Sequence, residues 1–346
     1  MKKPVALLAV MVLAAFLVLP VFASEKGEGG TEAKLSKTTV ITYDDFDSPG
    51  YSMTDYLAKW SNIYGPGEMA VRETRSFTGG KLFIDAAPFQ TGYDYSVYDH
   101  LKYLAVSNQT FTVPQVGSVT FSMDLVVETP GTFPEGRTVT GTYGPSGSYP
   151  NGAPYSMVAL EPQQASASLH MIDFSTGQLF DWLVSGHAAV TLIERLPSTV
   201  TGNTTDVNSP LYVGRSKMYT QIIEEVPLGP GTHRFAIAYT REKDGSYVEY
   251  FLDGKRVSKV KNVGVPLDVQ GIKYSGIYPS MGPGELLKDK VNSVAIAHGL
   301  ISLMDAFPFQ HPEAPELSVS VPLSERLFGQ GARASYDNFI VTIEER

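Results

Sequence analysis

The stretch GTHRFAIAYTREKDGSYVEYFLDGKRVSKV, residues 231–260, decides the fold. Large apolar residues alternate with small or polar ones along residues 235–239 and again along residues 247–252, as expected of strands that bury one face. A Lys-Asp-Gly turn separates the two runs, and Asp253-Gly254 follows the second. Because a type I′ turn needs positive φ at both central residues, which Asp-Gly supplies, a third strand should fold back after Gly254. The stretch therefore predicts a three-stranded antiparallel meander.

Strand signals continue on both sides of this meander, as short Val-, Ile-, Phe- and Tyr-rich runs bounded by Gly and Pro. Residues 53–60 are a candidate for one or two helical turns. Residues 291–304 fit either period, and we favour a strand because Gly299 interrupts the run. Residues 129–156 are rich in Gly and Pro and predict a long loop. The pattern is that of an all-β protein, and its clearest other strands are residues 39–43, 119–127 and 339–343.

The first 23 residues have the features of a secretory signal peptide. Lys2 and Lys3 precede an apolar run, and residues 21–23 offer small or branched side chains for cleavage. The alternative is an uncleaved membrane anchor, although the run is short for a span of ~20 residues. Residues 24–37 are polar and Gly-rich and predict a flexible leader. We therefore expect a secreted or periplasmic protein, with no membrane contact after cleavage, whose residues 38–346 form one domain.

Composition narrows the functional classes. The chain has no Cys, so its core alone must stabilise it, which is feasible at this length. A secreted chain without disulfides is more typical of a bacterium than of an animal. The net charge is −9 and the sequence has no basic stripe, which argues against a nucleic-acid partner. The motifs of zinc proteases, α/β-hydrolases and nucleotide enzymes are absent from the sequence.

The meander resembles the laminin-G and pentraxin members of the concanavalin A-like lectin and glucanase superfamily. In those proteins a Gly-x-His strand precedes a strand that ends in Asp-Gly-Lys, as Gly231-Thr232-His233 and Asp253-Gly254-Lys255 do here. The resemblance implies a jelly-roll β-sandwich of two antiparallel sheets. It also implies that a sheet face binds sugars, since the superfamily often uses its sheet faces in this way.

The chain also resembles a mostly bacterial family of unknown function, through short motifs that occur in the same order. This resemblance supports a shared fold and implies no catalytic residues. The motifs are Asp44-Asp45-Phe46, Asp99-His100-Leu101-Lys102-Tyr103-Leu104, Met171-Ile172-Asp173-Phe174, Glu194-Arg195-Leu196-Pro197, Gly329-Gln330-Gly331 and Asp337-Asn338-Phe339.

The catalytic signatures of the superfamily are incomplete in this chain. Its glucanases carry Glu-x-Asp-x-Glu, or a variant with one more residue, on one strand. Here Glu242-Lys243-Asp244 is the only Glu-x-Asp, and it lies in the predicted turn without a third carboxylate. Residues 71–77 and 272–279 are similar to strands of alginate lyases, but no Gln-x-His follows. A hydrolase or lyase therefore stays an alternative without assigned residues.

Residues 168–197, SLHMIDFSTGQLFDWLVSGHAAVTLIERLP, predict two further hairpins. Alternate residues of a strand face opposite sides, so Trp182 should face the core and Asp181 a concave groove or solvent. Glu194 should lie close to Asp181 across the second turn. Two nearby carboxyl groups can divide acid and base roles, whereas the alternative is a solvated ion-pair network of little energetic value. The predicted ligand-binding residues of this groove are His170, Asp181, Glu194 and Arg195.

The segment TGYDYSVYDHLKY, residues 91–103, combines tyrosines with acidic residues and a histidine. Aromatic rings stack on the apolar faces of sugars while carboxylates bond the hydroxyls. The alternative is that Tyr is simply a good β-strand residue. The sugar contacts expected from this segment are Tyr95, Tyr98 and His100.

Acidic residues gather near both ends of the predicted domain. The terminal strands of jelly rolls are commonly neighbours, so these residues could supply several of the six to eight oxygens that a structural Ca²⁺ requires. The alternative is that the Asp side chains cap turns. The predicted metal ligands are Asp44, Asp45, Asp47 and Asp337.

Taken as a whole, the sequence predicts a secreted β-sandwich that binds a polysaccharide or other glycan in a concave groove without turnover. One alternative is an enzyme that cleaves polysaccharides, either a glycoside hydrolase or a lyase. Another is a structural envelope protein that binds no small ligand.

Overall fold

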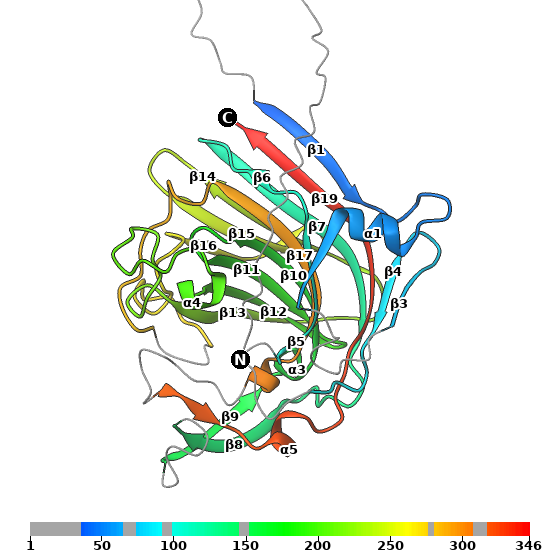
Figure 1. Cartoon of the computed structure of the whole chain (residues 1–346), viewed down its shortest axis with the longest axis vertical. Helices are drawn as coiled ribbons and strands as arrows, with labels where there is room; N and C mark the ends of the chain where they lie inside the picture. Colours follow the sequence, from blue (N-terminus) through cyan, green and yellow to red (C-terminus); the bar gives the residue numbers. More distant parts are fainter. Residues whose placement is uncertain (1–35, 65–73, 92–98, 145–151, 276–279, 307–316) are drawn as a thin grey trace, which may run out of the picture. The chain divides into compact units, whose positions relative to one another are not determined.

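The alternating strands pair into two large antiparallel sheets, which we name sheet A and sheet B (Figure 1). The computed structural model describes residues 36–64, 74–91, 99–144, 152–275, 280–306 and 317–346. Residues Ser36–Arg346 form one compact unit. The architecture is the predicted all-β jelly-roll sandwich of two antiparallel sheets.

Sheet A contains eight strands, of which seven follow one another edge to edge. An eighth, β1 (Lys37–Asp44), pairs with β19. In spatial order the seven are β16 (Lys255–Lys261), β15 (Ser246–Leu252), β14 (His233–Arg241), β7 (Gly117–Glu128), β19 (Arg333–Glu345), β4 (Leu82–Asp85) and β3 (Thr74–Phe77).

Sheet B also contains eight strands, and the small β6 (Phe111–Thr112) pairs with β17 beside the main path. The main path is β13 (Tyr219–Pro227), β12 (Ala188–Arg195), β11 (Gln178–Val184), β10 (Ser166–Asp173), β17 (Ser293–Ile301), β5 (Leu101–Ser107) and β2 (Trp60–Tyr64).

A third, three-stranded sheet and several short helices complete the described residues. The third sheet is β18 (Val319–Ser320), β8 (Arg137–Tyr143) and β9 (Pro154–Ala159). The helices are α1 (Met53–Lys59), α3 (Glu161–Gln164), α4 (Ser198–Thr201), the 3₁₀ helix η1 (Leu303–Ala306) and α5 (Leu323–Arg326). Within the described part of the chain, no helix has the length and apolarity needed to cross a membrane.

The main core lies between sheets A and B. Trp182 of β11 is fully buried there, as predicted, with its ring 5.2 Å from that of Phe235 on β14. Its indole N–H donates to the carbonyl of Ala236 at 3.1 Å. The Tyr250 hydroxyl donates to the Leu192 carbonyl at 2.6 Å. These bonds join the two sheets and fix which face of sheet B turns inward.

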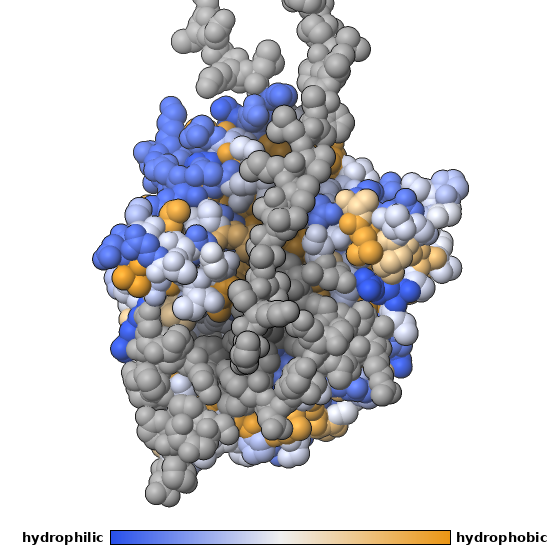
Figure 2. All heavy atoms as spheres, viewed as in Figure 1, coloured by the Kyte–Doolittle hydropathy of each residue, from blue (hydrophilic) through white to orange (hydrophobic). Residues whose placement is uncertain are grey.

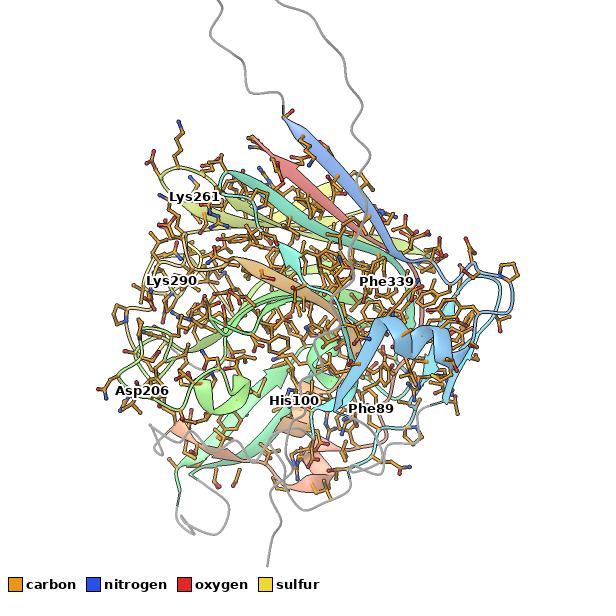
Figure 3. All side chains as sticks on the ribbon, turned by 45° about the horizontal axis from the view of Figure 1, so that its top comes forward. Phe89, His100, Asp206, Lys261, Lys290 and Phe339 are labelled. Carbon is orange, nitrogen blue, oxygen red and sulfur yellow. The ribbon has the colours of Figure 1, made fainter. Side chains whose placement is uncertain are left out.

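A second part of the core is an aromatic cage around His298 of β17. The His298 ring lies 4.7 Å from that of Trp60 and 5.2 Å from that of Phe339, which Figure 3 labels inside the sandwich. Nε2 of His298 lies 2.8 Å from the Tyr56 hydroxyl. Burial lowers the pKa of His298 to about 3, so this imidazole is neutral. The cage is therefore packed core.

The meander of residues 231–260 is confirmed as β14, β15 and β16. Asp253 and Gly254 have φ of 50° and 74°, the two positive values that a type I′ turn requires. β16 is an edge strand with charged side chains, including Lys255 and Lys261, which hinder pairing with another chain. Figure 2 shows this corner as hydrophilic, and Figure 3 labels Lys261 there.

The prediction of a long loop over residues 129–156 is wrong in part. β8 and the start of β9 lie within it and pair with each other, and β8 also pairs with β18. Val139 is fully buried in a small apolar group beneath this sheet. Gly and Pro residues precede β8 and separate it from β9 in the sequence, and the late partner strand β18 gives the pair a hydrophobic face that local composition does not reveal.

Other local predictions are confirmed. Residues 53–60 contain α1, whose Ser52 side chain and Asp55 form a capping box. Residues 291–304 contain β17, despite Gly299. A Cβ at position 299 would lie 2.3 Å from the Tyr103 carbonyl oxygen, so close approach of β5 explains the glycine within a strand.

Candidate functional site

The face of sheet B that turns away from sheet A, here named the outer face of sheet B, carries the predicted site residues. Along β10, Leu169 and Met171 join the core against sheet A. The alternate residues Ser168 and His170 therefore lie on the outer face. Asp181 of β11 shares this face, since Trp182 beside it points into the core. The predicted orientation of Asp181 relative to Trp182 is thus confirmed.

Three of these side chains form one hydrogen-bonded group, the Ser168–His170–Asp181 cluster. The strand register places His170 directly opposite Asp181. His170 Nδ1 lies 2.5 Å from Asp181 Oδ1, and His170 Nε2 lies 2.7 Å from Ser168 Oγ. Both ring nitrogens are therefore engaged, and two rigid neighbouring strands hold the imidazole between a hydroxyl and a carboxyl group.

Burial determines the charge of this cluster. Ser168, His170 and Asp181 are 0%, 5% and 1% exposed. Loss of hydration lowers the pKa of His170 to about 4 and raises the pKa of Asp181 well above its usual range. The imidazole is therefore neutral near pH 7. When its proton is on Nδ1, it donates to Asp181, and Nε2 accepts from the Ser168 hydroxyl.

Two buried polar atoms on this face lack a hydrogen-bond partner among the described residues. They are Asp181 Oδ2 and Ser166 Oγ. Ser166 lies two residues before Ser168 on β10 and so shares its face. Because a buried polar atom without a partner is costly, both are atoms that a bound ligand would satisfy.

Glu194 of β12 adds a second carboxyl group to the outer face. It alternates with Val190 and Leu192, which lie on this face, and it is partly exposed. Burial, and then the nearby charge of Asp181, raises the pKa of Glu194 to about 8. A carboxyl group that is protonated at neutral pH can donate one hydrogen bond and accept others.

Aliphatic side chains surround these polar groups. They form a second buried apolar group, separate from the main core, and its described members include no aromatic residue. The cross-strand neighbours belong to it: Leu183 faces Ser168, Ala297 faces His170 and Leu192 faces Asp181. Apolar contact with a ligand on this face therefore comes from aliphatic side chains.

Arg195, a predicted ligand contact, is not part of the site. It has the opposite parity to Glu194 and is 2% exposed. Its Nε donates to the Thr176 carbonyl at 3.1 Å, and a second guanidinium nitrogen donates to Glu285 at 3.2 Å. The guanidinium ties the end of β12 to a turn and to the loop that carries Glu285, so its role in the structure is to hold backbone segments together.

The tyrosine segment is only partly described. Tyr95 and Tyr98 lie outside the described residues. His100 is partly exposed, and its carbonyl accepts from Ser302 N at 2.9 Å. Tyr103 is fully buried in the aromatic cage on the core side of β5. A sugar contact through Tyr95, Tyr98 or His100 stays a prediction, whereas Tyr103 is a core residue.

Three of the four predicted calcium ligands, Asp44, Asp45 and Asp337, accept hydrogen bonds in the structure. Asp44 is 1% exposed and accepts from the Tyr51 hydroxyl at 2.6 Å, Lys59 Nζ at 2.8 Å and Trp60 Nε1 at 2.9 Å. Asp45 Oδ1 accepts from Asp47 N at 3.3 Å, and Asp337 Oδ1 accepts from the next backbone N–H at 2.7 Å. Across the described ranges, no three acidic, His or Cys side chains gather as a metal site would require. Calcium binding stays a prediction.

Sequence reasoning did not select Ser168, although a signal was present. Ser-x-His on a strand places both side chains on one face, and the Asp in the predicted register completes the cluster. The two serines of the β10 face looked like ordinary strand residues because their significance depends on which side is the core.

The outward face of sheet A offers the next candidate surface. Two hollows of about 380 and 530 Å³ lie along β7, β14 and β15 and along β3, β4 and β19. Their arginines are already paired: Arg234 donates to Asp124 at 3.0 Å, and Arg333 donates to Asp85 at 2.9 Å. The outer face of sheet B, with its unpartnered buried atoms, is therefore the stronger candidate site.

Comparison with known proteins supplies a family and similar folds. A family model described as "Family of unknown function (DUF6081)" matches residues 68–345, which confirms the family of unknown function indicated by the sequence motifs. No curated protein sequence matches the chain.

Several solved structures are similar to this chain at low identity. An endo-1,3-β-glucanase from Streptomyces sioyaensis has 10% identity and a TM-score of 0.45, with 92% of this chain and 100% of that chain covered. β-Agarase B from Zobellia galactanivorans has 10% identity and a TM-score of 0.36, covering 90% and 94%. A legume lectin-like domain from Entamoeba histolytica has 6% identity and a TM-score of 0.34, covering 88% and 98%.

Proposed function

The chain belongs to the family of unknown function DUF6081, and we propose that it is a secreted protein that binds carbohydrate on the outer face of sheet B. The unpartnered Asp181 Oδ2 and Ser166 Oγ carry this proposal. A sugar presents hydroxyls that donate to a carboxyl oxygen and accept from a serine, and C–H faces that pack against aliphatic side chains. The outer face of sheet B offers both kinds of contact.

The burial of the cluster favours this function over a solvated ion-pair network. Exposed ion pairs keep their hydration and need no ligand, whereas Asp181 and His170 are 1% and 5% exposed. Glu194, protonated at neutral pH, adds a donor that an ionised carboxylate lacks. The side-chain chemistry therefore suits a neutral, hydroxyl-rich ligand better than an anion.

The test is retention of the purified protein on a panel of neutral and acidic polysaccharides, followed by calorimetric titration with oligosaccharides of the retained one. Asp181→Asn keeps the shape of the side chain but replaces one carboxyl oxygen with an N–H donor, and it should weaken binding at least tenfold, about 1.4 kcal/mol. Asp206→Asn is the matched control, because Asp206 is exposed in a loop at the periphery (Figure 3). Equal affinity of the two variants, or no retention by any polysaccharide, would contradict the proposal.

A further inference from the structure

The order of groups in the Ser168–His170–Asp181 cluster is that of a nucleophile, a base and a residue that orients the base. A serine hydroxyl bonded to one imidazole nitrogen, with a carboxyl group on the other, is the arrangement that activates serine for acyl transfer on unrelated folds. The observed separations of 2.7 and 2.5 Å meet the geometric requirement without rearrangement. We propose that Ser168 is a catalytic nucleophile and that the outer face of sheet B hydrolyses carboxylic esters.

If the cluster had only a structural role, the buried polar atoms around it would all have hydrogen-bond partners, and in the described part of the chain two of them do not. Asp181 Oδ2 and Ser166 Oγ are buried without a partner among the described residues. The Ser166 hydroxyl is on the same face of the same strand as Ser168, where it can donate to the oxyanion that forms when Ser168 attacks. Gly299 lies opposite Ser168 in the register, and a Cβ there would come within 3.1 Å of Ser168 Oγ. A glycine at position 299 therefore avoids a side-chain contact with Ser168 Oγ, which is itself 0% exposed.

The reaction balances with water as the only co-reactant. Ser168 Oγ forms a bond to the ester carbonyl carbon while its proton moves to His170 Nε2. The tetrahedral intermediate breaks the ester C–O bond, and the leaving alkoxide takes that proton from Nε2 and departs as an alcohol. Water then attacks the acyl-serine, giving a proton to Nε2, and collapse returns the proton to Ser168 Oγ and releases a carboxylic acid.

The surroundings of Ser168 select the acyl group. Leu183 and Ala297 lie across from Ser168 and His170, and Ile301 lies across from Ser166. Aliphatic neighbours suit a short aliphatic acyl chain, and an acyl group that carries its own charge would lose its hydration among them. The expected substrate class is therefore an ester of a short aliphatic acid. The inference goes beyond carbohydrate binding and stands without it.

The first experiment measures release of p-nitrophenol from p-nitrophenyl acetate and p-nitrophenyl butyrate. Ser168→Ala should lower kcat/KM at least a hundredfold, whereas Ser216→Ala, in an exposed turn, should keep it unchanged. Asp181→Asn should lower kcat by about 10⁴-fold with little change in KM, because the imidazole loses the partner that fixes its tautomer. Hydrolysis that is equal in the wild type and Ser168→Ala would overturn the proposal.

The second experiment does not depend on the folding of any variant. The wild-type protein is treated with a small alkyl phosphonofluoridate, and the modified peptide is identified by mass spectrometry. We expect one adduct, on Ser168, and an adduct only elsewhere, or none, overturns the proposal. Neither readout requires a glycan. Ser168-dependent hydrolysis without polysaccharide retention contradicts only the carbohydrate proposal, and retention without such hydrolysis contradicts only this one.

Discussion

Trp182 and Asp181 are adjacent in the sequence, and their side chains lie on opposite faces of sheet B. The indole fills the core against β14, and the carboxyl group joins the cluster on the outer face. The strand β11 thus carries a core residue on one face and a residue of the cluster on the other. The burial of the Trp182 ring therefore determines the face on which the Asp181 carboxyl group lies.

The core role of Trp182 makes the first prediction. Trp182→Ala should lower the free energy of unfolding by ~3–5 kcal/mol, because the cavity left by a buried indole collapses only partly. Denaturant titration measures the change, with Phe174→Ala as the control since Phe174 is 39% exposed. A loss under ~1 kcal/mol would mean that Trp182 does not anchor the two sheets.

Glu194 gives the protein a dependence of stability on pH. Its folded-state pKa of about 8 lies above its ordinary value of 4.5. Between these values the folded state binds more protons than the unfolded chain, so the stability from this group is complete below pH 4.5 and is lost as pH rises through 8. Glu194→Gln should therefore flatten the fall in melting temperature over this range.

The control for this prediction is Glu224→Gln, since Glu224 is exposed on the neighbouring β13. That variant should keep the pH dependence of the wild type. If Glu194→Gln has the same slope as the wild type from about pH 5 to 8.5, Glu194 is not the carboxyl group that holds the additional proton.

Sequence parity predicts the side on which a residue lies but not what surrounds it. The faces of Asp181 and Glu194 follow from alternation around Trp182, whereas alternation does not predict that Asp181 is only 1% exposed. The sequence leaves either Glu194 or Arg195 as the groove residue of this strand, and the structure places Arg195 on the face opposite to Glu194. Ser168 can be recognised as a member of the cluster only when the position of the His170 ring is known.

At the scale of elements, one buried carboxylate joins three segments. Glu161 of α3 is 1% exposed and accepts from Thr132 at 2.8 Å, Ser185 at 2.9 Å and Thr129 at 3.0 Å, and it also bonds His187 in the turn between β11 and β12. These bonds lower the pKa of Glu161 against the opposing effect of burial. The turn that follows the Asp181 strand is therefore held to residues 129–132.

Glu161→Ala should lower the free energy of unfolding by about 3 kcal/mol, because several buried donors lose their acceptor at once. Glu135→Ala, exposed in the adjoining loop, should change it by less than about 0.5 kcal/mol. Hydrogen exchange should also speed up in the turn at residues 185–188 in the Glu161 variant. Equal stability of the two variants would show that Glu161 is not the link between these segments.

The third sheet contains strands that local sequence patterns do not predict. Strands β10, β11 and β12 were predictable because tight turns separate them and large apolar residues alternate. β8 and β9 were not, because their Gly- and Pro-rich surroundings are typical of loops and the partner β18 comes more than a hundred residues later. Short strands of this kind can be predicted only when the distant partner strand is known.

At the scale of the whole molecule, the packing of sheet A against sheet B makes the two faces of sheet B different. One face packs against sheet A, and the other carries the Ser168–His170–Asp181 cluster within aliphatic surroundings. The fold class was predictable from the meander and its Asp-Gly turn, because both are local. Only the face that carries the site and three of its polar residues could be predicted, because the hydrogen bonds between the site residues depend on the register of neighbouring strands.

The most direct test of the outer face of sheet B as the ligand site is NMR of the protein with isotope-labelled histidine. The chain has six His, so each imidazole can be assigned by substitution. On titration with an oligosaccharide of the retained polysaccharide, the ring signals of His170 should shift in proportion to occupancy. Those of His233, on sheet A and bonded to Asp253, should stay constant. Saturable binding that leaves the His170 signals unchanged would contradict the assignment of the site to this face.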